Sequence, residues 1–261
     1  MLSTVRNLAL PVICSKEKQY RHLLKQAFYG AKELTKPNNI NKDFERVSAD
    51  VVARAAVFQP AILSDVNGRR GALHGRIKAL RPHMKLAGPA FTVEVRPGDN
   101  LMIHAALALA KPGDVLVIDG KGDQTCALMG TIMMNAARQR GLAGVILDAA
   151  VRDSLDIEEM DYPVFSVGTN PNGPTKEVGG RVGHPISCGG VTVHPGDFIT
   201  ADADGVMCIE REKIGTLIDK AQEKVEAEAR RIAGIKEGKL SAPWLTKSLV
   251  TAGVLKEGEE L

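Results

Sequence analysis

Two short apolar segments flanking one amphipathic segment stand in the middle of the chain and constrain its fold more than any other feature. The apolar segments are residues 114–119 and 144–148, each bounded by turn-forming residues. Between them, residues 127–140 carry apolar side chains at helical spacing. Two short buried strands joined through one helix predict a βαβ unit with parallel strands and a right-handed crossover.

An Arg-Asp pair, Arg152 and Asp153, follows the second predicted strand. In a parallel unit, strand ends and helix starts share one edge of the sheet, so this pair is expected to face the helix start at residues 130–133. Amides at a helix start attract anions. A guanidinium binds carboxylates bidentately, and a carboxylate is a hard oxygen ligand for Mg²⁺ or Mn²⁺. An isolated Arg-Asp dipeptide is more often a surface ion pair, but this placement favours a site for a small anion or a metal-chelating substrate.

Hydrophobic patterns and turn residues predict further elements on both sides of this unit. Helices are predicted at residues 15–35, 49–58, 100–110 and 211–236, and strands at 90–95, 162–167, 189–193, 198–201 and 206–209. The last three strands, separated by tight turns, suggest a meander. A Gly-, Pro- and Asn-rich loop at 168–183 is of a kind often found at functional sites or interfaces.

Because helices and strands alternate, the predicted class is α/β, with one domain over residues 41–236. A helical extension precedes it at residues 1–40, and a tail follows it at residues 237–261. Asp65 and Asn100 are candidates to reach the same cleft as the Arg-Asp pair.

The bulk composition argues against several classes of partner. The net charge is only +3 and aromatic residues make up 4% of the chain, which disfavours a nucleic-acid partner. The apolar N-terminal segment is too short for a membrane span and lacks the features of a signal peptide. The four cysteines, Cys14, Cys126, Cys188 and Cys208, are scattered without a CxxC pair, which favours a reducing, cytoplasmic location.

Common catalytic and cofactor motifs are missing or incomplete. Residues 120–126, expected to connect strand to helix, hold two glycines, but Thr125 stands where a dinucleotide fingerprint needs a third. The sequence contains no HExxH zinc motif and no GxSxG nucleophile elbow. Cys126 is expected to be a small buried filler, and Asp202 and Asp204 are expected to cap their own turn.

A set of short segments resembles the RraA-like family over roughly residues 45–230. The segments are GPAFT (88–92), GDN (98–100), GDVLVIDG (113–120), GLAGVILD (141–148), VRD (151–153), GGVTVHPGD (189–197) and DADGV (202–206). That family includes the class II 4-hydroxy-4-methyl-2-oxoglutarate and 4-carboxy-4-hydroxy-2-oxoadipate aldolases, and also regulators that bind and inhibit a ribonuclease. The resemblance implies an RraA-like α/β/β sandwich, assembled as homotrimers or homohexamers with active sites between subunits.

The resemblance also implies residue roles. Asp153 matches the ligand of a divalent metal, Mg²⁺ or Mn²⁺, and Arg152 matches the substrate-binding arginine; both would be catalytic. The helix-start residues that match the amides holding a pyruvyl carboxylate are Gly130, Thr131, Ile132 and Met133. Thr131 stands where the aldolases usually carry an acidic residue, and Asp148-Ala149 replaces a common Asp-Gly.

Together these features predict a metal-dependent lyase whose small-molecule substrate is a 2-oxo acid. The expected reaction is retro-aldol cleavage of a 4-hydroxy-2-oxo acid to give pyruvate, and the same enolate chemistry would decarboxylate oxaloacetate. The alternative is a non-catalytic regulator that binds a ribonuclease or another protein, which would not need a metal ligand beside the arginine. A quinone methyltransferase is disfavoured because the chain has no glycine-rich motif for its cofactor.

Overall fold

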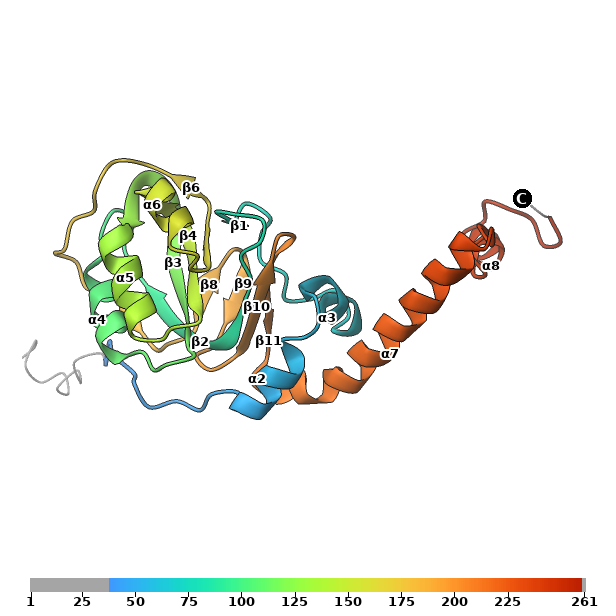
Figure 1. Ribbon diagram of the computed structural model, residues 1–261, viewed down its shortest axis with the longest axis horizontal. Helices are drawn as coiled ribbons and strands as arrows, with labels where there is room; N and C mark the ends of the chain where they lie inside the picture. Colours follow the sequence, from blue (N-terminus) through green and yellow to red (C-terminus); the bar gives the residue numbers. More distant parts are fainter. Residues whose placement is uncertain (1–37, 260–261) are drawn as a thin grey trace, which may run out of the picture. The chain divides into compact units, whose positions relative to one another are not determined.

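The structure is a computed structural model that describes residues 38–259. The helix predicted at residues 15–35 and Cys14 lie outside the described residues. Residues from Ile40 onward form one unit, which contains all the elements below (Figure 1).

A mixed sheet forms the centre of this unit, with strand order β1-β5-β4-β3-β2-β10-β11 (Figure 1). Neighbours among β2, β3, β4 and β5 pair in parallel, whereas β10 pairs antiparallel with β2, β11 with β10 and β1 with β5. The strands of this path are β1 (Lys78–Ala79), β2 (Leu86–Glu94), β3 (Val115–Met129), β4 (Gly144–Val151), β5 (Val164–Ser166), β10 (Phe198–Asp202) and β11 (Gly205–Ile209). Two short strands extend it, β6 (Gly168–Thr169) beside β4 and β7 (Arg181–Val182) beside β2.

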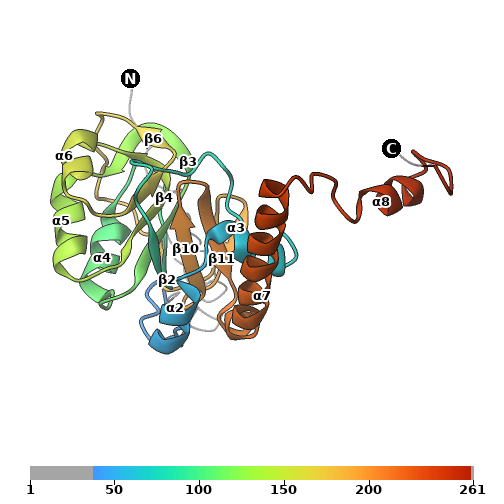
Figure 2. The ribbon, with the colours of Figure 1, turned by 45° about the vertical axis from the view of Figure 1, so that its right-hand side comes forward.

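Helices cover this sheet in two groups (Figures 1 and 2). The connections between successive parallel strands contain α4 (Leu101–Leu109), α5 (Thr131–Gln139) and α6 (Ser154–Glu159). Their buried side chains join those of β2, β3 and β4 in one hydrophobic cluster. The opposite face of the parallel strands packs on a separate hairpin of β8 (Ile186–Cys188) and β9 (Val191–Val193).

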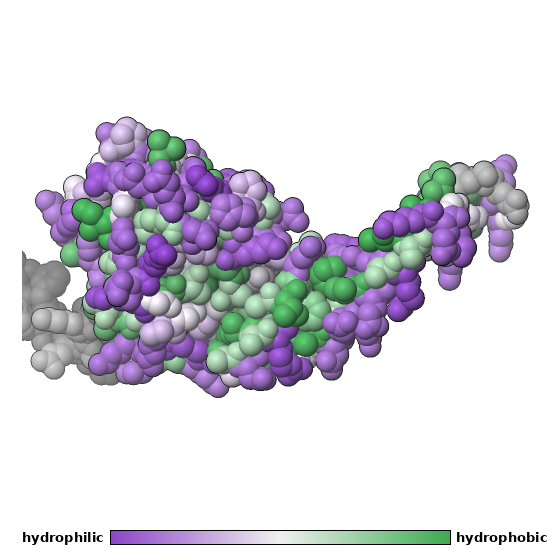
Figure 3. All heavy atoms as spheres, viewed as in Figure 1, coloured by the Kyte–Doolittle hydropathy of each residue, from purple (hydrophilic) through white to green (hydrophobic). Residues whose placement is uncertain are grey.

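The second group packs beside β10 and β11. It consists of α2 (Ala49–Ala55), α3 (Pro60–Val66) and the first half of α7 (Arg211–Lys236), which share a third cluster with Phe198, Met207 and Ile209. Figure 3 shows hydrophobic residues on this face where α2, α3 and the start of α7 meet. The short α8 (Leu245–Thr251) follows and contains no buried residue. None of the helices within residues 38–259 combines the length and apolarity needed to cross a membrane.

The predicted parallel strand–helix–strand unit is confirmed, but its internal boundaries differ from the prediction. The helix starts at Thr131 rather than at residue 127, because residues 127–129 are still paired with β4. The predicted loop at residues 120–126 is an excursion within β3. Twelve residues of β3, from Ile118 to Met129, run alongside only five of β4, from Leu147 to Val151. The second strand also continues to Val151, beyond the predicted end at residue 148.

The predicted meander of three strands is wrong. β9 pairs with β8 across the turn at Gly189 and Gly190, where both glycines have positive φ, so that of the three predicted strands only β10 and β11 pair with each other. β10 instead uses its other edge to pair with β2, a long-range contact that local turn signals do not report. The predicted turn cap is confirmed, because the Asp204 amide donates to Asp202 Oδ1 at 3.0 Å.

Candidate active site

The end of β4 turns sharply where the Arg-Asp pair begins. The Arg152 amide still donates to the Met129 carbonyl of β3 at 3.0 Å. Asp153 then adopts a left-handed conformation with φ of 57° and serves as the N-cap residue of α6. This conformation is uncommon for a residue with a side chain, although Asp tolerates it better than most. The turn directs the Asp153 side chain back to α5, where Oδ2 accepts a hydrogen bond from the Thr131 amide at 3.0 Å.

Gly130, the N-cap residue of α5, makes this arrangement sterically possible. A Cβ atom at this position would lie 2.4 Å from Asp153 Oδ2, 3.0 Å from Arg152 Cγ and 3.2 Å from Arg152 Nε. The backbone of Gly130 is extended, with φ of −143°, so no left-handed conformation requires glycine here. The space beside the helix start is therefore what the missing side chain provides, and the side chains of Arg152 and Asp153 occupy it.

A pocket of about 190 Å³ opens at this corner. Its polar and charged side chains come from three regions of the chain: Asn100 and His104 from the start of α4, Arg152 and Asp153 from the end of β4, and Lys176 from the loop before β7. The Arg152 and Asp153 side chains are 43% and 40% exposed, and Arg152 Nε lies 3.8 Å from Asp153 Oδ2. Both charged groups are thus accessible to a ligand rather than committed to a buried ion pair.

The helix-start residues of the predicted site meet at the pocket, but their amides differ in availability. Gly130, Ile132 and Met133 line the pocket, whereas Thr131 does not. The Thr131 amide donates to Asp153, and the Met133 amide donates to the Gly130 carbonyl at 3.0 Å. Among the described residues, the Ile132 amide has no hydrogen-bond partner. Among these helix-start amides, that of Ile132 is therefore the most available to an anion.

Asn100 reaches the pocket, as expected, but Asp65 does not. Asn100 Nδ2 donates to the Leu128 carbonyl at 2.8 Å, while its Oδ1 is buried without a hydrogen-bond partner in the described part of the chain. Asp65 instead forms an ion pair with Lys224 of α7 at 3.0 Å. His104 and Lys176 were not identified from the sequence, because neither stands in a motif and both arrive through the fold.

The loop at residues 168–183 lines one side of the pocket through Pro174 and Lys176. Near its start, the Asn172 carbonyl accepts the Ala127 amide at 2.9 Å, and Asn170 Nδ2 donates to the Gln124 carbonyl at 2.8 Å. Gly173 follows so close to Arg152 that a Cβ there would lie 3.0 Å from Nη1. The excursion of β3 therefore anchors the loop, and the loop in turn packs against the guanidinium.

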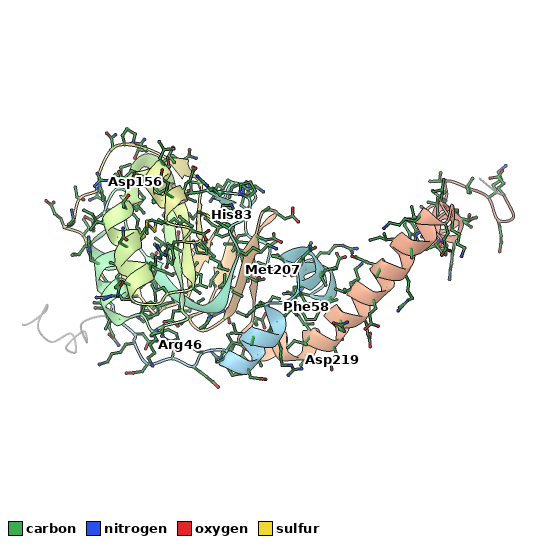
Figure 4. All side chains as sticks on the ribbon, in the orientation of Figure 1. Arg46, Phe58, His83, Asp156, Met207 and Asp219 are labelled. Carbon is green, nitrogen blue, oxygen red and sulfur yellow. The ribbon has the colours of Figure 1, made fainter. Side chains whose placement is uncertain are left out.

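The other residues near this edge have structural roles. Thr131 Oγ1 donates to Asp156 Oδ2 at 3.3 Å, which ties the start of α5 to α6; Asp156 is labelled in Figure 4. Cys126 is only 7% exposed, and burial raises the pKa of its thiol, in agreement with the expected buried filler. Two further cavities lie elsewhere, one lined by residues of the α2–α3 connection, β2 and β10, and the other by residues of the α3–β1 connection, β9 and the start of α7. The second also holds a guanidinium and a carboxylate, those of Arg70 and Asp197. Asp197 is only 3% exposed, however, and already accepts hydrogen bonds from the His194 and Arg211 amides.

The oxygen donors at this corner fit a hydrated hard cation. Within residues 38–259 there is no cluster of three or more His, Cys, Asp or Glu side chains that could hold a metal ion. Asp153 supplies one carboxylate at the pocket, and the amide oxygen of Asn100, another lining residue, is buried without a hydrogen-bond partner in the described part of the chain. Mg²⁺ commonly binds through one or two protein carboxylates and retains several waters. The residues present are thus compatible with a cation that water and a chelating ligand help to coordinate.

Comparison with known proteins places the chain in a family. A family model described as RraA-like, Aldolase/RraA, matches residues 48–208. A protein of Halalkalibacterium halodurans named "Putative 4-hydroxy-4-methyl-2-oxoglutarate aldolase" is 38% identical over 185 residues, which cover 70% of this chain and 88% of that protein.

Solved structures show the same similarity. Streptomyces coelicolor RraAS2, described as an unusual member of the RNase ES inhibitor RraA protein family, superposes with a TM-score of 0.66 at 26% identity, covering 72% of this chain and 98% of that one. A Geobacillus kaustophilus protein titled S-adenosylmethionine: 2-dimethylmenaquinone methyltransferase gives a TM-score of 0.54 at 35% identity, covering 58% and 94%. The α/β architecture, the matched residues and these relatives agree: the chain belongs to the RraA-like family.

Proposed function

We propose that this protein is a divalent-metal-dependent lyase that cleaves a 4-hydroxy-2-oxo acid to pyruvate and a second carbonyl compound. The observation that carries the proposal is the pairing of Arg152 and Asp153 against the side-chain-free Gly130, on the wall of an open pocket. The aldolase names of the relatives point to the same reaction class.

The reaction assigns a task to each side of the pocket. The C4 hydroxyl loses its proton, the C3–C4 bond breaks, and its electrons form an enolate over C2 and C3, which takes up a proton at C3 to become pyruvate. In the proposal, Arg152 donates hydrogen bonds to the substrate's C2 oxygen, and the Ile132 amide binds the C1 carboxylate. Donors already in position where negative charge develops are usually the largest single contribution to catalysis.

Asp153, which supplies the carboxylate of this pocket, would hold Mg²⁺ or Mn²⁺. When bound, such a cation would supply positive charge at the substrate's C2 oxygen. Asp153 also fixes the corner itself, because its hydrogen bond to the Thr131 amide holds the end of β4 against the start of α5. The same charge stabilisation would allow decarboxylation of oxaloacetate, which also passes through a pyruvate enolate.

Substitution of the pair tests the proposal. Asp153→Asn retains a side chain that tolerates the left-handed conformation and can still accept from Thr131, but it loses the charge. We expect it to abolish metal-dependent pyruvate release, measured through lactate dehydrogenase with Mg²⁺ or Mn²⁺ and a panel of branched 4-hydroxy-2-oxo diacids. Arg152→Ala should lower turnover by several orders of magnitude, because it removes the hydrogen-bond donor to the oxygen on which negative charge develops.

Asp161→Asn is the matched control, because Asp161 also has a positive φ of 50° but an 82% exposed side chain outside the pocket. It should retain full activity. Binding of Mn²⁺, followed by electron paramagnetic resonance, should weaken in Asp153→Asn and not in the control. Full activity of Asp153→Asn would refute the proposal.

The alternative function is that of a regulator that binds a ribonuclease or another protein. The description of the Streptomyces relative favours it. A wild-type protein that releases no pyruvate from any substrate of the panel, yet lowers ribonuclease activity in a stoichiometric mixture, would establish this alternative instead.

We further propose a homotrimer or homohexamer in which a neighbouring subunit covers the edge of the pocket. Each helix over this face exposes one large apolar side chain in its first turn: Leu101 of α4 (38%), Ile132 of α5 (84%) and Leu155 of α6 (74%). These positions share the edge of the sheet at which the pocket opens, and apolar groups grouped there are typical of an interface. Sedimentation velocity should give a trimeric or hexameric mass, and a monomer would contradict the proposal.

A further inference from the structure

A buried carboxylate fixes the part of the loop that carries Lys176. Asp99, only 1% exposed, lies in the turn before α4. Its Oδ2 accepts hydrogen bonds from Thr175 Oγ1 at 2.6 Å, the Glu177 amide at 2.7 Å and the Val178 amide at 3.2 Å. The residues on both sides of Lys176 are therefore attached to one side chain.

Backbone hydrogen bonds strengthen this attachment. The Thr175 amide donates to the Gly98 carbonyl at 2.8 Å, and the Asn100 amide donates to the Thr175 carbonyl at 3.0 Å. Two residues earlier, Gly173 packs against the Arg152 guanidinium. Lys176 thus projects from a segment fixed at both ends, although its side chain is exposed and long.

The charge of Asp99 persists at all ordinary pH values. Burial raises the pKa of this carboxyl, but hydrogen bonds from the Glu177 amide, the Thr175 hydroxyl and the Leu101 and Val178 amides outweigh it and lower the pKa to about 2. A carboxylate that accepts several amide hydrogen bonds is stabilised in its charged form. The Asp99 carboxylate can accordingly accept these hydrogen bonds in its charged form at neutral pH.

Lys176 itself has no hydrogen bond or ion pair with another residue in the described part of the chain. It lines the same pocket as Arg152, which gives the pocket two cationic side chains against the one carboxylate of Asp153. Under the proposed function, Arg152 and the Ile132 amide already bind the pyruvyl end of the substrate. The second cation then remains available to a second anionic group of the ligand.

We propose that Lys176 binds a distal carboxylate of the substrate, and that Asp99 is a positioning residue that holds Lys176 over the pocket. This inference rests on the proposed function only in placing the pyruvyl end at Arg152. It makes Lys176 a determinant of specificity for dicarboxylates over monocarboxylates, through a charge-assisted hydrogen bond.

Two ligands that differ only at the distal end test the proposal without turnover. 2-Oxoglutarate carries a carboxylate where 2-oxopentanoate carries a methyl group. We expect the full-length protein with Mn²⁺ to bind 2-oxoglutarate about tenfold more tightly in isothermal titration calorimetry, as one charged hydrogen bond of about 1.5 kcal/mol would give. Lys176→Met should remove this preference by weakening 2-oxoglutarate alone, and Lys176→Arg should retain most of it.

Lys220→Met, at an exposed position of α7 outside the pocket, is the matched control and should change neither affinity. Asp99→Asn should reduce the preference, and adding it to Lys176→Met should have no further effect, because the two residues would act through one contact. Additive effects would overturn the positioning role of Asp99.

Three outcomes would overturn the role of Lys176: no preference in the wild-type protein, no change in Lys176→Met, or an equal loss for both ligands. Failure of the proposed function is distinguishable from these. A protein that releases no pyruvate but shows a preference that depends on Lys176 would refute the lyase reaction and leave the carboxylate-binding role intact.

Discussion

The substitution Gly130→Ala separates the geometry of the site from the stability of the fold. The added Cβ would stand 2.4 Å from Asp153 Oδ2, whereas real Cβ contacts stay beyond 3.0 Å. The carboxylate must therefore move by about 0.6 Å or more, and Arg152, at 3.0 Å and 3.2 Å, must adjust with it. A displacement of about 1 Å in a catalytic group costs on the order of 100-fold in rate, so we expect turnover to fall about 10- to 100-fold.

The same substitution should hardly change the free energy of unfolding. The extended backbone at residue 130 accommodates alanine, which by itself stabilises a protein by about 0.4–1 kcal/mol through the unfolded chain. Loss of the hydrogen bond between Asp153 and the Thr131 amide costs about 1 kcal/mol. The two effects nearly offset each other, so urea denaturation should give a value within about 1 kcal/mol of wild type.

Pyruvate release measured beside urea denaturation checks this prediction, and Gly75→Ala is the control. A Cβ at Gly75 meets no atom within 4 Å, and this glycine needs no positive φ. Gly75→Ala should leave both activity and stability unchanged. Full activity of Gly130→Ala would refute the reasoning that the missing side chain makes room for the Arg-Asp pair. Global unfolding of this variant would refute the prediction that the substitution hardly changes the free energy of unfolding.

Two further predictions concern buried charges. Asp114 is 1% exposed and accepts hydrogen bonds from Arg46, labelled in Figure 4, at 2.7 Å and 2.9 Å. Urea denaturation of Asp114→Asn should show a free energy of unfolding lower by about 3–5 kcal/mol, because the substitution leaves a partly buried guanidinium without its charge partner. Asp50→Asn is the control and should cost less than about 1 kcal/mol, because Asp50 and its partner Arg54 are exposed and lie 3.8 Å apart. Asp99 has a folded pKa below its ordinary value of 3.8, so its contribution is present above about pH 4 and is lost as the pH falls through about 2. Wild-type stability should therefore lose about 2 kcal/mol over that window relative to Asp99→Asn, and parallel pH profiles of the two proteins would contradict this.

Local pattern identified the elements whose signals are contained in a few neighbouring residues. The βαβ unit, the helix at residues 211–236 and the Asp202–Asp204 turn all follow from periodicity or from turn chemistry. The start of α5 does not follow from local pattern, because an apolar run at residues 127–129 suits a helix as well as a strand. Pairing with β4 decides that question, and pairing depends on residues more than twenty positions away.

The site divides in the same way. Arg152, Asp153 and the helix start at Gly130 could be predicted together because parallel strand order alone brings strand ends and helix starts to one edge. Lys176 could not, because its approach depends on the hydrogen bonds of Asp99 to a loop more than seventy residues later. No sequence spacing records such a contact.

By itself, the sequence determined the class of the fold and the chemical character of one corner, since alternation of short strands and helices and the order of an Arg-Asp pair are properties of neighbouring residues. The tertiary structure decided which amide remains available, how the left-handed turn at Asp153 directs its carboxylate, and which second cation faces the pocket. These depend on contacts between distant segments, whose geometry is fixed only when the sheet, its helices and the long loop pack together.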